Sequence, residues 1–283
     1  MNLSDCKILI CPLDGLPLQK QGSSMECANN HSFDIAKQGY VNLLPVQNKR
    51  SKQPGDNKVM VDARRRFLQS AAYQSIAQRV SEEVKSQELD ALNGLDAGCG
   101  EGYYLSYIRR ALLAEGSTLI QNLVGVDISK QAILAAAKQD RDVTWVVGSN
   151  RQLPVQDQSL DFVICMFGFP DFAEFNRVLQ QQGRVILVDP CEEHLVELRA
   201  LLYDEVHKTS APKHDEAYRH GFSLVKEEVF QYQVTLTSTQ QILDLAMMTP
   251  HYFRAKAEAR AKLESVDSLE VTVSLSIRVL KKL

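Results

Sequence analysis

The chain has 283 residues, of which 45% are hydrophobic and 24% are charged, as in a soluble globular protein of one or two domains. It holds no run of about eighteen apolar residues, so no membrane span is expected, and residues 1–10 lack the pattern of a signal peptide. Three cysteines, Cys99, Cys165 and Cys191, are scattered in apolar or glycine-rich surroundings, which indicates reduced thiols. We therefore expect a cytoplasmic protein.

The net charge of −3 is unevenly distributed along the chain. Residues 1–70 contain ten Lys and Arg against six Asp and Glu, whereas the remainder contains twenty-two against twenty-nine. A basic N-terminal region on an acidic body favours an anionic substrate, but it fits a solvated basic face without a partner equally well.

Residues 1–45 are rich in Gly, Pro, Asn and Cys, which predicts a small, loop-rich module. A module of this size usually needs a metal, a disulfide or docking to a larger domain. Residues 46–93 follow as a polar, basic linker with a turn signal at residues 54–56 and a helical stretch over residues 59–88.

From residue 94 onward, short apolar runs alternate with helical stretches. Strands are expected at residues 95–98, 123–127, 144–148, 160–167 and 184–189. Helices are expected at residues 103–114, 129–139, 172–180 and 192–207. This alternation predicts an α/β fold with a parallel sheet and helices on both faces. Two later strands, at 230–237 and 271–279, flank a helix at 240–248 and would make the sheet mixed if they are antiparallel.

The most informative motif is a strand that leads into Gly98, Gly100 and Gly102 and then into a helix. A dinucleotide fingerprint of the G-x-G-x-x-G type would need glycine at position 103, where Tyr103 stands. Asp96 lies two residues before the first glycine. This D-x-G-x-G-x-G arrangement resembles motif I of the class I S-adenosylmethionine-dependent methyltransferases, whose Rossmann-like sheet binds its cofactor at the carboxyl ends of the strands.

Two further positions agree with a S-adenosylmethionine site. Asp127 ends the next predicted strand, where a carboxylate can accept hydrogen bonds from both ribose hydroxyls. Asn150 lies in the loop after the third strand, which resembles the adenine-side loop of that family. The alternative is a tight turn in another kind of α/β enzyme.

The N-terminal module carries Cys11, Asp14, Cys27 and His31, a spacing close to the C-x2-C and C-x3-H pattern of zinc sites. The run Phe-Asp-Ile-Ala-Lys-Gln-Gly-Tyr-Val-Asn-Leu-Leu-Pro follows at residues 33–45. With the glycine loop and the run Ala-Met-Met-Thr-Pro at 246–250, it resembles the bacterial 23S rRNA (guanine-N1)-methyltransferase family, often called RlmA, over nearly the whole chain.

The resemblance implies a zinc-ribbon-like RNA-recognition module in residues 1–45 and a methyltransferase domain in residues 94–283. It also implies a homodimer that methylates N1 of a guanine in a hairpin loop of 23S rRNA, with neither DNA nor a membrane as partner. The family has cysteine where Asp14 stands. Three alternatives follow: Asp14 is itself a ligand, Cys6 replaces it, or the metal is lost.

The family's cofactor contacts imply Gly100 and Glu101 in the loop, together with Tyr73 and His194. Without the resemblance, Tyr73 would be an ordinary half-buried helix aromatic and His194 an ordinary histidine at a helix start. The RNA-binding candidates are the basic residues of the linker, Lys49, Arg50, Lys52, Arg64, Arg65 and Arg66. The alternative for the three arginines is a helix surface with ordinary i,i+4 pairs.

Methyl transfer from a sulfonium is a direct displacement, so the enzyme mainly aligns the reacting atoms and needs no covalent nucleophile. A carboxylate could accept the N1 proton of guanine, and Asp189 and Asp171 are candidates that could equally be capping residues. The segment 167–170 stands where the family shapes its acceptor pocket, and an aromatic there could stack on a base or belong to the core. Two competing hypotheses are a methyltransferase of small molecules and a degenerate RNA-binding protein without activity.

Overall fold

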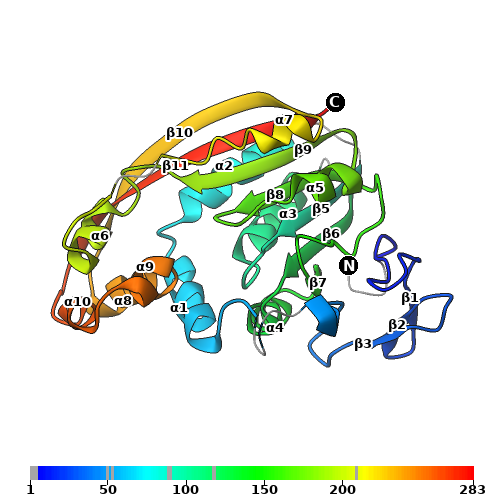
Figure 1. Ribbon diagram of the computed structural model, residues 1–283, viewed down its shortest axis with the longest axis horizontal. Coiled ribbons are helices and arrows are strands. Elements are labelled where there is room, and N and C mark those ends of the chain that lie inside the picture. Colours follow the sequence, from blue (N-terminus) through cyan, green and yellow to red (C-terminus); the bar gives the residue numbers. More distant parts are fainter. Residues whose placement is uncertain (1–5, 49–50, 52–53, 88–90, 117–118, 208–209) are drawn as a thin grey trace.

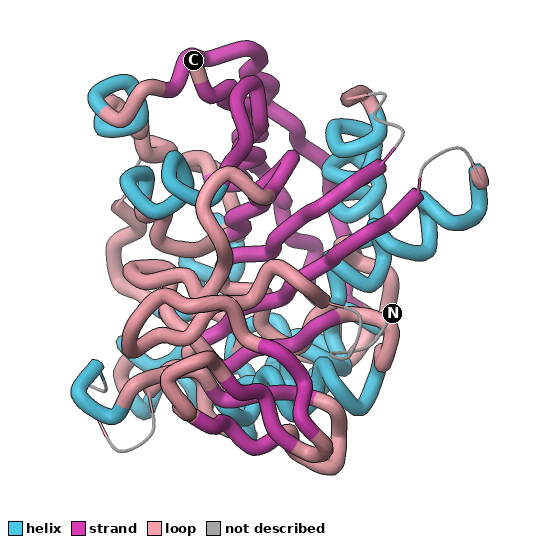
Figure 2. Tube along the Cα trace, turned by 90° about the vertical axis from the view of Figure 1, so that its right-hand side faces the viewer, coloured by secondary structure: helices cyan, strands magenta, loops and turns pink. Residues whose placement is uncertain are grey.

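A computed structural model describes residues 6–48, 51, 54–87, 91–116, 119–207 and 210–283. An eight-stranded mixed sheet in the order β10-β11-β9-β8-β5-β6-β7-β4 runs through the molecule, and a three-stranded sheet lies at one end (Figure 1). Helices lie on both sides of the large sheet (Figure 2), which confirms the predicted fold class. Within these residues, no helix combines the length and the apolar character that a membrane crossing requires.

The central strands of the large sheet are parallel to one another. They are β5 (Ala91–Ala97), β6 (Leu119–Asp127), β7 (Thr144–Val147), β8 (Leu160–Met166) and β9 (Leu179–Pro190). From β5 the chain proceeds outward to β6 and β7, and then returns to the other side of β5 to form β8. This reversal creates a switch point at the carboxyl ends of β5 and β8, where open α/β sheets bind their ligands.

Apolar side chains alternate between the two faces of the sheet and enter two separate cores. On β9, Ile186 and Val188 join one core, and Val185 and Leu187 join the other. The first core is covered by helices α1 (Lys58–Gln69), α2 (Gln74–Lys85), α3 (Tyr103–Glu115), α4 (Lys130–Gln139), α6 (Val196–Leu202), α8 (Thr239–Met247) and α10 (Ala257–Leu263). The second core is covered by α5 (Phe172–Val178), α7 (Glu216–Arg219) and the N-terminal segment.

The N-terminal segment forms an antiparallel sheet of β1 (Gln19–Gln21), β2 (Ser24–Glu26) and β3 (Ser32–Asp34). The chain then enters the large sheet as β4 (Tyr40–Asn42), parallel to β7, and a 3-10 turn, η1 (Val46–Asn48), follows. Leu9 and Val41 are fully buried, and the Ile10 amide donates to the Pro154 carbonyl at 3.0 Å. The segment is therefore docked to the sheet by both apolar and backbone contacts.

The carboxyl-terminal part adds a long hairpin to the edge of the sheet, and the expected antiparallel pairing is confirmed. Its strands are β10 (Phe222–Leu236) and β11 (Leu269–Lys282). Helices α8, α9 (Pro250–Arg254) and α10 are inserted between these strands. Helix α8 packs on α1, and Asp244 accepts two hydrogen bonds from the Arg66 guanidinium, at 2.6 and 3.0 Å.

Three predicted helices were wrong in length because tertiary contacts override helical periodicity. The helix expected over 59–88 is two helices, separated where Ala71 has a left-handed φ of 63° and Tyr73 is buried. The helix expected over 172–180 ends at Val178, because Leu179 already begins β9. The helix expected over 192–207 is only α6, since Leu195 has φ 54° and its amide donates to the Thr272 carbonyl of β11.

Candidate cofactor site and metal centre

The glycine loop joins β5 to α3 with a backbone that only glycine adopts readily. Gly98, Gly100 and Gly102 have φ angles of 90°, 56° and 83°. At Gly102 the space is also closed, since a Cβ atom would lie 2.4 Å from the ring of Trp145. The loop is therefore held close against the sheet, with Gly98 exposed where a ligand can approach the backbone.

Asp127, at the carboxyl end of β6, ties this loop to the next strand. One carboxylate oxygen accepts the Gly100 amide at 2.9 Å and the other accepts the Ser129 amide at 2.7 Å. An ionised carboxylate offers about four lone pairs, so acceptor positions remain for two hydroxyl groups. The side-chain amide nitrogen of Asn150 also lies beside this loop, 3.9 Å from where a Cβ atom on Gly98 would stand. This arrangement fits the ribose and adenine sides of a nucleoside.

Asp96 is the most unusual acid of the site. Its side chain is buried, and neither carboxylate oxygen has a hydrogen-bond partner among the described residues. Burial, with the nearby Asp127 and Glu101 carboxylates, raises the pKa of Asp96 well above its ordinary value. A buried carboxyl group without partners is costly unless a ligand supplies donors. The ammonium group of S-adenosylmethionine is a donor of the required charge, so the residues present fit this cofactor.

A single arginine faces the acids of the loop. Burial raises the pKa of Glu101 to about 7, and the Arg64 guanidinium opposes this rise. Arg64 pairs with Asp56 at 2.6 Å and donates to the Met248 carbonyl at 3.5 Å. Arg64 therefore lies at the cofactor loop, whereas the sequence places it among the RNA-binding candidates.

The other RNA-binding candidates fall into three groups. Arg65 is exposed, and Arg66 is engaged by Asp244 as described above. Lys49, Arg50 and Lys52 lie outside the described residues. Three neighbouring arginines of one helix thus have three different surroundings.

Three aromatic rings lie across the carboxyl ends of β8 and β9. The ring of Phe167 is 6.4 Å from that of Tyr73 and 6.2 Å from that of His194, with an interplanar angle of 25° in both pairs. Phe167 has a left-handed φ of 53° and remains 40% exposed. Strained backbone at an exposed aromatic is typical of ligand-binding positions.

His194 is held as a neutral donor. Burial, followed by the charges of His251 and Arg199, lowers the pKa of His194 to about 3. Its Nδ1 atom accepts the Ser274 amide at 3.3 Å, so the proton is carried by Nε2. The Nε2–H group is then available to a carboxylate such as that of the cofactor.

Sequence reasoning missed Tyr104 as a site residue. Its hydroxyl is buried without a hydrogen-bond partner in the described part of the chain, and Tyr73 and Glu101 lie within electrostatic reach of it. Its place in the first turn of the helix after the glycine loop was the available signal, because that turn faces the ligand in nucleotide-binding sheets.

The two candidate bases are both engaged with other groups. Asp171 caps α5 by accepting the Glu174 amide at 3.1 Å, the capping role that the sequence left open. Asp189 lies 2.7 Å from the Nε2 atom of His214, and both side chains are buried. Each carboxylate therefore holds a structural contact, and its role as the proton acceptor for a bound base stays a prediction.

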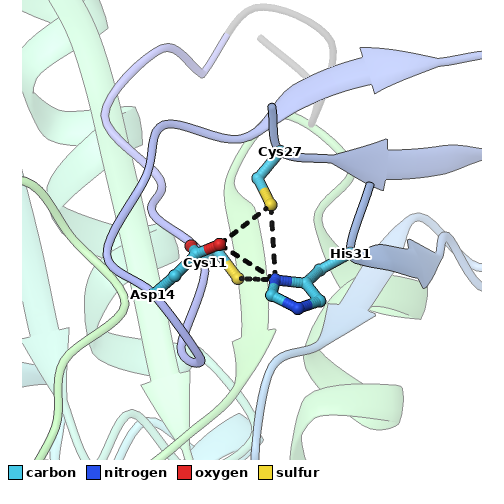
Figure 3. A group of neighbouring side chains, drawn as sticks. All are labelled: Cys11, Asp14, Cys27 and His31. Atoms are coloured by element: carbon cyan, nitrogen blue, oxygen red, sulfur yellow. Dashed lines mark hydrogen bonds and ion pairs between the residues drawn. The ribbon is translucent and has the colours of Figure 1, made fainter. Parts of the chain in front are cut away.

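The four predicted metal ligands converge at one point between two turns (Figure 3). The His31 Nδ1 atom lies 3.4 Å from the Cys11 sulfur, 3.5 Å from the Cys27 sulfur and 3.0 Å from a carboxylate oxygen of Asp14. The Cys27 sulfur lies 3.4 Å from the same oxygen. Ligands of tetrahedral zinc are separated by about 3.3–3.8 Å, so the donor set fits zinc with little adjustment.

The carboxylate of Asp14 is oriented by its neighbours. One oxygen accepts a hydrogen bond from the backbone amide of Leu16 at 3.1 Å. The other oxygen, which faces the cluster, accepts one from the side-chain amide of Asn29 at 3.0 Å. Such secondary contacts orient metal ligands. Cys6, the alternative ligand, is buried near Thr144 and lies outside the cluster, so that alternative is wrong.

Comparison with known proteins divides the chain into an N-terminal ribbon and a methyltransferase domain. Residues 9–52 match the family model described as the N-terminal zinc ribbon of RlmA, and residues 95–188 match that of a methyltransferase domain. A Bacillus subtilis protein provisionally named as a 23S rRNA (guanine-N1)-methyltransferase is 29% identical over 97% of both chains.

Two further relatives carry the same kind of name. A Micromonospora griseorubida protein, also named provisionally, is 31% identical over 78% of this chain and 83% of its own length. The 23S rRNA (guanine(748)-N1)-methyltransferase of Streptomyces fradiae is 30% identical over 70% of this chain and 69% of its own. With similarity of this extent across ribbon and sheet, the chain belongs to the 23S rRNA (guanine-N1)-methyltransferase family.

Proposed function

We propose that this protein transfers a methyl group from S-adenosylmethionine to N1 of a guanine in a hairpin loop of 23S rRNA. One observation carries the proposal: a relative similar over 97% of the chain and another similar over 70% of it are named for this one reaction. The ribbon argues against a small-molecule substrate, which needs no such appendage. The intact glycine loop with Asp96 and Asp127 argues against a degenerate protein without activity.

The cofactor, when bound, supplies the electrophilic methyl group. We assign its ribose to Asp127 and its adenine side to Asn150, with the backbone of Gly98, Gly100 and Gly102 against the nucleoside. We assign its ammonium group to Asp96, with Glu101 nearby, and its carboxylate to His194 beside Tyr73. These residues position the methyl group, and Phe167, at the same edge of the sheet, provides a ring on which the acceptor base can stack.

We propose that zinc is held by Cys11, Asp14, Cys27 and His31, with Asp14 in the place of the family's cysteine. Residues 1–45 then act as the RNA-recognition module, residues 46–93 as the basic connection that includes Arg65, and residues 94–283 as the methyltransferase domain. We further propose a cytoplasmic homodimer.

The proposal is tested by incubating the purified protein with labelled S-adenosylmethionine and 23S rRNA that lacks modifications. Methylation at N1 blocks the Watson–Crick edge of guanine, so primer extension should stop one nucleotide before a single loop guanine. The variant Asp127→Asn serves as the control, because it keeps the shape of the side chain and removes its charge. Tight cofactor binding without a stop in 23S rRNA would contradict the proposed substrate, and no cofactor binding would contradict the enzymatic function.

A further inference from the structure

Helices α9 and α10, with the residue before α10, carry a group of cationic and aromatic side chains that the proposed function does not use. We call it the α9–α10 surface, and it consists of the exposed residues Phe253, Arg254, Lys256 and Lys262 and the partly exposed Arg260. Residues 249–264 contain four Lys and Arg against the two acids Glu258 and Glu264, whereas the whole chain has a net charge of −3. The surface is therefore a local positive region on an acidic protein.

This surface borders the candidate site. The hydroxyl of Tyr203 lies 3.2 Å from the Nδ1 atom of His251, on α9, and the charge of His251 contributes to the lowered pKa of His194. Arg64 reaches the Met248 carbonyl just before α9. Figure 1 places α9 and α10 with α6 and α8 at the end of the molecule toward which the arrows of β8 and β9 point.

The zinc-ribbon-like module lies elsewhere. Figure 1, whose horizontal direction is the longest axis of the molecule, shows β1, β2 and β3 at the opposite end from α9 and α10. The ribbon of a chain is therefore far from the edge of the sheet where that chain's own acceptor base would lie. RNA next to the target base needs a second surface close to that edge.

The side chains of the surface suit single-stranded RNA. Within the described ranges Arg254 and Lys262 form no ion pair, although the charge of Lys262 contributes to the lowered pKa of Asp204. Lys256 pairs with Asp204 at 3.0 Å, and both side chains are highly exposed. An exposed pair of this kind contributes little and can exchange for a phosphate. The Arg260 guanidinium lies 5.6 Å from the centre of the Tyr252 ring, and Phe253 is 45% exposed. Cations for the backbone beside a ring for a base are the elements of single-strand recognition.

We propose that the α9–α10 surface binds the RNA strand that flanks the target guanine. Arg254 and Lys262 contact phosphates, and Phe253 stacks on an unpaired base. The inference rests on the proposed function, because it takes the methylated hairpin as the ligand. It adds a second RNA-binding surface to the one expected in the ribbon.

The test compares two double charge reversals in the full-length, zinc-loaded protein. Arg254→Glu with Lys262→Glu changes the surface, and Arg219→Glu with Lys138→Glu changes two exposed residues on α7 and α4. We expect the first pair to raise the KM for the hairpin RNA about 10-fold or more. The slope of log affinity against log salt concentration should become shallower by about 0.7 for each of the one to two phosphate contacts that are lost. The control pair should stay within about twofold of wild type. Affinity for S-adenosylmethionine and the melting temperature should stay unchanged in both.

Substitution of the same pair by glutamine gives a milder loss in the same direction and covers the case in which charge reversal unfolds the helices. Phe253→Leu should raise the KM about fivefold or more, whereas Phe253→Tyr retains the ring and should restore it. If the wild type is active and the surface and control variants have equal KM values, the inference is overturned and the proposed function is not. A wild type that methylates no RNA would instead overturn the proposed function.

Discussion

The cofactor loop and the metal cluster both gather acidic or ligating side chains, but the chain builds them differently. The ligands of the metal cluster come from two short turns within residues 11–31, and their atoms all lie within 4.8 Å of one another. The acids of the cofactor loop are carried by β5, β6 and the turn after β5, where the sheet holds them even though Asp96 has no hydrogen-bond partner in the described part of the chain. We therefore expect the locally built cluster to gain order from its metal, whereas the sheet-built site is preformed and keeps a buried, unpaired carboxyl group for its ligand.

The largest effect is expected from Cys27→Ser, which removes a ligand from the small module. Because structural zinc contributes folding energy directly, RNA methylation should fall by about 100-fold or more. Affinity for S-adenosylmethionine, measured by calorimetry, should change by less than about threefold, since the sheet-built site is separate. Asp14→Cys is the matched control and should retain zinc, as measured by mass spectrometry. A large loss of cofactor affinity in Cys27→Ser would show that the two regions depend on each other.

The next effect concerns Asp127, the preformed acceptor. Asp127→Asn should weaken the affinity for S-adenosylmethionine about 10- to 100-fold, because charge-assisted hydrogen bonds are lost. Asp161→Asn is its control: this carboxylate also accepts a backbone amide, from Asn93 at 2.7 Å, but at the other end of its strand. Equal affinities in the two variants, at equal melting temperatures, would place the cofactor elsewhere.

A smaller effect is expected from pH. The pKa of Glu101 is raised to about 7 by burial, so this carboxyl is neutral below that pH and negative above it. A cationic ligand is attracted by the charged form, so cofactor affinity should rise about fivefold between pH 6 and 7.5. Glu101→Gln should give a flatter profile. A wild-type affinity that falls over this range would contradict the role of Glu101.

The smallest effect distinguishes two neighbouring arginines. The Arg64 guanidinium lowers the pKa of Glu101, so Arg64→Gln should move the midpoint of that pH profile upward by up to about one unit. Arg65→Gln should leave the midpoint in place and raise the KM for RNA about two- to threefold, as expected for one exposed phosphate contact. If both variants changed only the KM for RNA, Arg64 would belong to the RNA-binding group after all.

Much of this protein follows from its sequence, because the determining signals are local. The spacing of Gly98, Gly100 and Gly102 between an apolar run and a helix predicts the loop, whose φ angles then require glycine. The alternation of apolar runs predicts the layered sheet, and the short turns around Cys11 and Cys27 predict the metal cluster. Each of these features depends on residues close together in the chain.

Only the tertiary structure decided the partners of side chains that are distant in sequence. Arg64, Arg65 and Arg66 are a single basic run in the sequence, yet packing of α1 against α8 and the glycine loop directs Arg64 to the Met248 carbonyl and Arg66 to Asp244. Asp189 meets His214 across 25 residues, a partner that the sequence does not predict. The helix breaks at Ala71 and Leu195 likewise follow from contacts with distant elements. Local spacing determines backbone geometry, whereas the partner of a charge depends on which surfaces long-range packing brings together.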